Sequence, residues 1–132
     1  MAPNSSRPLS PHVQIWRWHP TMASSILHRA TGIANYLGAV LVSVWLVLLA
    51  SGPEAYGVWQ DVKAGPLGIL VTLALIGFTF SVVYHLLNGL RHLAWDIGLG
   101  LDAKGSNLRS LLIIGGSVVI TAIIWIIGKG VI

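Results

Sequence analysis

Cysteine is absent from the 132 residues, and charged side chains make up only 9% of them. The lack of cysteine excludes disulfides and thiolate metal sites. Soluble globular domains carry about a quarter charged residues. A chain this short, with this few charges, cannot cover its surface with polar groups. The 55% hydrophobic content and the mean hydropathy of +0.77 indicate a single membrane domain instead.

Long apolar runs take the place of the missing charges, over residues 31–50, 66–90 and 111–127. Each approaches or exceeds the roughly 20 residues that a helix needs to cross a bilayer. None alternates polar and apolar residues, as the strands of a membrane barrel do. The sequence therefore predicts an all-α membrane protein with three transmembrane helices, at about 25–50, 66–97 and 108–128. These helices form one domain, 25–132, after an N-terminal arm, 1–24. The breakers SGPEAYG and LDAKGSN separate them.

Basic residues are distributed unevenly along this pattern. Six of the eight fall before the first helix or around the second connection: Arg7, Arg17, Arg29, Arg91, Lys104 and Arg109. The other two, Lys63 and Lys129, fall on the opposite side. The positive-inside rule then places the N-terminus on the cytoplasmic side, or the matrix side of a mitochondrion, and the C-terminus opposite. Because the charge of +4 surrounds apolar segments and forms no basic face, no nucleic-acid partner is expected.

Titratable side chains gather at the end of the second apolar run, in YHLLNGLRHLAWD, residues 84–96. Ionisable groups inside a membrane helix are costly and usually functional. His85 and His92 are seven residues apart, so both imidazoles lie on one helix face, with Gly89 between them leaving room for a flat ligand. His85 is a candidate haem ligand, with Arg91 and His92 within reach of anionic propionates.

Other interpretations of these histidines stay open from spacing alone. His85 could hydrogen-bond a neighbouring helix or serve a proton relay, while Arg91 and His92 could extend to the headgroups. A six-coordinate haem also needs two axial ligands, and His28 is expected to lie too shallow in the first helix to pair easily with His85. The sequence thus hints at a partner that supplies the second ligand.

The stretch SSILHRATG places Ser25, His28 and Arg29 where the chain enters the membrane. Ser25 and Arg29 are four residues apart and share a helix face. A hydroxyl beside a guanidinium can hydrogen-bond a carbonyl-bearing ligand or an anion. The alternative, favoured by chemistry alone, is an arginine that extends to the headgroups beside a serine near the helix N-terminus.

Two long motifs resemble known signatures. RPLSPHVQIWRWHPTMASSILHRATGIA, residues 7–34, is similar to the N-terminal signature of the succinate dehydrogenase cytochrome b556 anchor subunit family, and HLLNGLRHLAWDIG, residues 85–98, resembles the family's second signature. The resemblance implies a membrane anchor that joins a second small anchor subunit, an iron–sulfur subunit and a flavoprotein subunit. Electrons from succinate would pass through these partners to ubiquinone, in the tricarboxylic acid cycle and the respiratory chain.

The resemblance also assigns roles to residues. It implies one haem b shared with the second anchor, with His85 as this chain's axial ligand and His28, Arg29 and His92 near the propionates. Ser25 and Arg29 would line the ubiquinone pocket. The bacterial inner membrane is the expected location, ahead of the mitochondrial one. A quinol-oxidising fumarate reductase anchor and a cofactor-free structural or transporter subunit remain as alternatives.

Overall fold

The computed structural model describes residues 16–131, and all regular secondary structure in this part of the chain is α-helical, without a strand. The elements are α1 (Pro20–Ala50), α2 (Pro53–Ala64), α3 (Gly68–Asp96) and α4 (Ala103–Val131). Arg7 and most of the predicted arm, residues 1–15, lie outside the described residues. The predicted all-α fold with three long apolar helices is confirmed.

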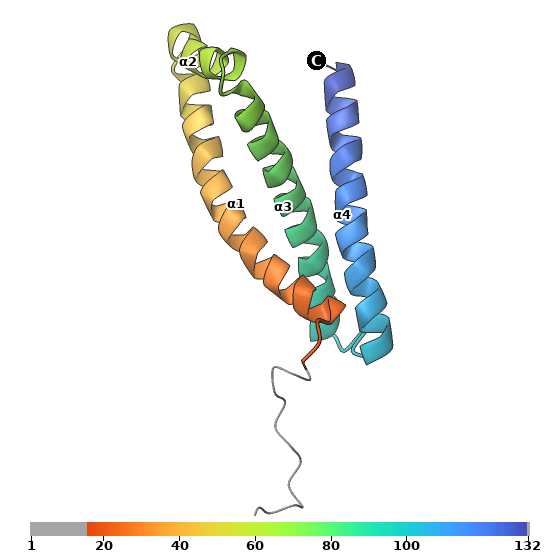
Figure 1. The fold of residues 1–132 in the computed structure, drawn as a ribbon. Coiled ribbons are helices and arrows are strands. Elements are labelled where there is room, and N and C mark those ends of the chain that lie inside the picture. Colours follow the sequence, from red (N-terminus) through yellow and green to blue (C-terminus); the bar gives the residue numbers. More distant parts are fainter. Residues whose placement is uncertain (1–15, 132) are drawn as a thin grey trace, which may run out of the picture.

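Three of the four helices are long and apolar enough to cross a membrane, namely α1, α3 and the Ala103–Lys129 part of α4. Figure 1 shows them side by side, with the beginning of α1, the end of α3 and the beginning of α4 meeting at one end of the bundle. The short helix α2 and the end of α4 lie at the other end. Which end faces the cytoplasm stays a prediction from charge bias.

Helix boundaries differ from the sequence-based prediction at two N-termini. α1 begins at Pro20 instead of about residue 25, because Pro20 occupies the first turn after the extended residue His19, where its missing N–H costs no hydrogen bond. α4 begins at Ala103 instead of about residue 108, and the Gly105 amide donates to the Asp102 carboxylate at 2.7 Å. Such a side-chain acceptor satisfies one of the free amides of a first helical turn.

The connection between the first two spans is itself mostly helical, which the sequence analysis did not predict. The break before this short helix is confined to Ser51 and Gly52, and the Gly52 φ of 100° favours glycine. A second break, at residues 65–67, follows it. Pro53 then starts α2, with Glu54 in its first turn and Lys63 in its last. Both charges complement the helix dipole. The interpretation of SGPEAYG as a breaker throughout was therefore wrong beyond Gly52.

The helices contact one another through small and polar residues rather than large apolar ones. Tyr84 is the one large hydrophobic side chain that is fully buried among the described residues. Gly38 on α1 lies directly against the ring of Phe78 on α3, where a Cβ would collide with the ring. Leucine, isoleucine and valine mostly point outward. This arrangement suits a bundle in lipid, where close backbone approach and hydrogen bonds associate helices.

Candidate functional site

Three imidazole rings stack where α1 crosses α3. The His28 ring lies between the other two, with centroids 3.9 Å from His85 and 5.0 Å from His92 and interplanar angles of 15° and 19°. The expectation that His85 and His92 share one face of α3 is met by this common contact. His28, from the other helix, joins them.

His28 lies deeper than the sequence analysis expected. Because α1 begins at Pro20, His28 is eight residues inside the helix, about 12 Å along its axis. From the adjacent end of α3, His92 lies about 6 Å deep and His85 about 17 Å, so His28 falls between them. Its ring stacks on the face of His85, and the expectation that His28 does not supply the second haem ligand stays a prediction.

The His85 ring is held by α1 on one side. Its Nδ1 lies 3.2 Å from the His28 carbonyl oxygen and 3.3 Å from Thr31 Oγ1. A Cβ added at Gly32 would lie 3.3 Å from His85 Cε1, a close contact. The other ring nitrogen, Nε2, makes no hydrogen bond to any described residue and remains available to a ligand.

Of the other two rings, His92 is the more exposed. His92 Nδ1 lies 2.8 Å from the Asn88 carbonyl oxygen, and its exposed ring meets Trp95 edge-on at 4.8 Å. His28 Nδ1 is buried without a hydrogen-bond partner among the described residues. A Cβ at Gly89 would meet nothing within 4 Å, so the space that the sequence predicted beside this glycine is present.

Ser25 and Arg29 lie together on the outer face of α1. Both side chains are exposed, and neither makes a hydrogen bond within residues 16–131. Their shared face is thus as predicted, and it leaves a hydroxyl and a guanidinium pointing away from the bundle. Their predicted role in binding a quinone is not decided by this placement.

A buried polar network beside the histidines escaped the sequence analysis. Ser24, 1% exposed, donates to the Asn88 side chain at 3.1 Å, and the Tyr84 hydroxyl donates to the Ser24 carbonyl at 2.7 Å. Arg91 Nη1 donates to Ser24 Oγ at 3.3 Å and to Ser110 Oγ at 2.8 Å, which extends the network to α4. Ser24 and Ser25 are adjacent in sequence but point to opposite faces, and only the packing tells them apart.

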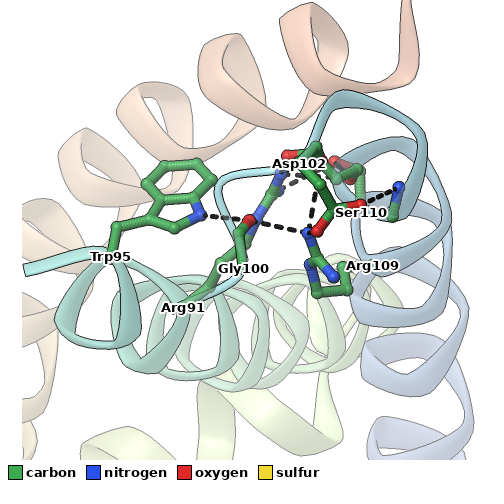
Figure 2. Close-up of polar contacts among 8 residues, drawn as sticks. Arg91, Trp95, Gly100, Asp102, Arg109 and Ser110 are labelled. Carbon is green, nitrogen blue, oxygen red and sulfur yellow. Dashed lines mark hydrogen bonds and ion pairs between the residues drawn. The ribbon is translucent and has the colours of Figure 1, made fainter. Parts of the chain in front are cut away.

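Arg91 does not take the place that the sequence analysis gave it. The side chain is 7% exposed and points between α3 and α4, donating to Ser110 Oγ at 2.8 Å (Figure 2). It also donates to Ser106 Oγ at 2.7 Å and to the Ser106 carbonyl at 3.1 Å. Its guanidinium also lies over the Trp95 ring, 4.4 Å from the centroid. Arg91 therefore joins helices inside the bundle and does not face the histidine stack, and it makes no ion pair with Asp96.

The connection from α3 to α4 is tied down by the carbonyl of Gly100, which accepts from Trp95 Nε1 at 3.1 Å and Arg109 Nη2 at 2.6 Å (Figure 2). Arg109 also pairs with Asp102 at 2.8 Å. Hydrogen bonds from Arg109 and from the Gly105 amide hold the pKa of Asp102 below its usual value. A cavity of about 310 Å³ lies here, lined by Arg91, Trp95, Leu99 and Arg109 among others and by none of the histidines.

Comparison with known proteins identifies the family. Residues 3–124 match the succinate dehydrogenase/fumarate reductase transmembrane subunit family. The chain belongs to this family. It is 38% identical over 122 residues, 92% of each chain, to the succinate dehydrogenase cytochrome b556 subunit of Paracoccus denitrificans, and 36% identical over 92% of this chain and 93% of the relative to that of Rickettsia bellii. The mitochondrial cytochrome b560 subunit of Sus scrofa is 46% identical over 98 residues, 74% of this chain and 57% of the relative.

The residues present fit the haem that the name cytochrome b implies. His85 offers an unengaged Nε2 at the membrane-embedded part of α3, and Gly89 leaves open space one turn further along the same helix. The buried Nδ1 of His28 lacks a partner in the described chain and could serve a polar group of a ligand. No group of three or more histidine or carboxylate side chains is placed to hold a metal ion in residues 16–131.

Proposed function

We propose that this chain is the cytochrome b subunit of a succinate dehydrogenase, which anchors the iron–sulfur and flavoprotein subunits and shares a haem b with a second small anchor subunit. The observation that carries the proposal is the histidine stack. One imidazole nitrogen deep in the bundle is left for iron, and the residues around it are those of the family's motifs. Family membership and the names of the relatives support the same role.

His85 is the proposed axial ligand, and the partner anchor provides the other. A bound haem b would supply one-electron redox chemistry. His28 and His92 lie between His85 and the end of the bundle that charge bias places on the cytoplasmic side, where haem propionates would be expected. Imidazole N–H groups there can donate to carboxylates, and the exposed guanidinium of Arg29 adds a positive charge.

Ser25 and Arg29 are the proposed quinone contacts. Their side chains are exposed on one face of the first part of α1. This helix begins at the end of the bundle where α3 ends (Figure 1). The Ser25 hydroxyl would donate to a ubiquinone carbonyl, and Arg29 would stabilise the negative charge that develops on that oxygen during reduction. In the complex this face would meet the iron–sulfur subunit, and charge bias places it on the cytoplasmic side of a bacterial inner membrane.

The test is a pair of substitutions in the purified complex. His85→Ala should remove the low-spin b-type bands from the reduced-minus-oxidised spectrum, and unchanged bands would exclude His85 as ligand. Arg29→Ala should lower succinate:ubiquinone activity by roughly 10²-fold, the usual effect of deleting one charge-stabilising donor, while succinate oxidation by an artificial acceptor persists. Lys129→Ala, at the far end of α4, is the control. To distinguish a succinate dehydrogenase from a fumarate reductase, the direction of turnover is measured with ubiquinone and with menaquinone.

A further inference from the structure

The geometry points to Thr31 as a positioning residue for the haem ligand: together with the His28 carbonyl, its hydroxyl fixes the tautomer and orientation of the His85 imidazole. This inference rests on the proposed function, because it concerns how this chain presents His85 to iron. Thr31 is 5% exposed and lies on α1, one turn beyond His28. It is not a ligand itself.

The hydrogen-bond donors and acceptors decide the tautomer. The Thr31 hydroxyl donates its single proton to the carbonyls of Leu27, at 2.8 Å, and His28, at 3.0 Å. One neighbour of His85 Nδ1 is the His28 carbonyl oxygen, 3.2 Å away, which can only accept. This contact requires Nδ1 to carry the proton, so the lone pair lies on Nε2, the nitrogen left for iron. Because the Thr31 proton is given to the carbonyls, its oxygen accepts from the same Nδ1–H, 3.3 Å away.

The packing of α1 also restrains the orientation of the His85 ring. Gly32 is the residue next to Thr31, and a Cβ there would lie 3.3 Å from His85 Cε1, closer than most such contacts. The stacked His28 ring, 3.9 Å away, covers one face of His85. One short segment, 28–32, thus supplies both acceptors and both steric limits. A metal-bound histidine whose other N–H is held by an acceptor is oriented and is a more basic ligand.

The consequence is a shift in the haem reduction potential. A more basic imidazole stabilises ferric over ferrous iron, so loss of the Thr31 acceptor should favour the ferrous state. Because the His28 carbonyl remains as an acceptor, we expect the equilibrium ratio of ferrous to ferric haem to rise by only about two- to tenfold. For a one-electron couple this is a rise of about 18 to 59 mV in the midpoint potential.

The experiment measures the haem midpoint potential and haem content of the purified complex. Thr31→Val, which keeps the shape and loses the hydroxyl, should raise the potential, and Thr31→Ser should leave it near the wild-type value. Thr121→Val is the matched control, because Thr121 is equally buried at 6% and bonds only within α4. If the valine complex does not assemble, Thr31→Ala also removes the hydroxyl and carries the same expectation.

Two results would overturn the inference. One is a wild-type potential in a haem-replete Thr31→Val or Thr31→Ala complex. The other is an equal rise in Thr31→Ser, since the hydroxyl would then not be the cause. A wild-type complex without haem, in contrast, would refute the proposed function itself, so the two failures are distinguishable.

Discussion

Arg91→Ala should destabilise the bundle more than deletion of any exposed arginine. Its guanidinium makes four hydrogen bonds, of 2.7 to 3.3 Å, to Ser24, Ser106 and Ser110, and so joins α3 to both neighbouring helices. Interhelical hydrogen bonds in a membrane protein average about 0.6 kcal/mol, while those to charged groups reach about 1.5 kcal/mol or more. The substitution removes these four hydrogen bonds together with the buried charge that makes them. We therefore expect the free energy of unfolding to fall by about 2 to 4 kcal/mol.

The assay is unfolding of the purified chain by SDS titration in mixed micelles, followed by helical circular dichroism. Arg29→Ala is the matched control, since Arg29 is exposed and should change the free energy of unfolding by about 0.5 kcal/mol or less. Arg91→Lys should fall between the two, because an ammonium cannot span Ser106 and Ser110 with a planar fork. Equal stabilities for Arg91→Ala and Arg29→Ala would refute the reasoning.

Two further predictions concern packing and the loop before α4. Gly38→Leu should separate α1 from α3 at Phe78 and cost about 1 to 3 kcal/mol in the same titration, as overpacking does; no change would show that the helices can move apart freely. The lowered pKa of Asp102 means that its contribution is complete above the ordinary value of 3.8 and is lost as the pH falls through the lower folded value. Protection of the Gly105 amide from hydrogen exchange should fall in that acidic range, and Asp102→Asn should abolish this pH dependence; a wild-type profile in that variant would rule out the carboxylate as its source.

The three spans were predictable because lipid leaves little choice. An apolar run of sufficient length must satisfy its backbone internally, so it forms a helix. The short helix α2 was missed because Gly52 and Pro53 look like the start of a loop, whereas Pro53 instead begins a helix. The early start of α1 was missed for the same reason at Pro20. Prolines punctuate a sequence, but the local pattern alone does not tell whether a helix or a loop follows.

Within the site, the sequence alone determined which chemistry was present: imidazoles on one face of the second span, and a serine and an arginine on one face of the first. Helical periodicity fixes such relations within an element. Only the tertiary structure decided that His28 stacks between His85 and His92, that Thr31 contacts the His85 ring, and that Arg91 points into the bundle while Arg29 points out. These outcomes depend on how far each helix extends and on the angle about its axis at which it packs, and both are set by contacts between residues distant in the sequence.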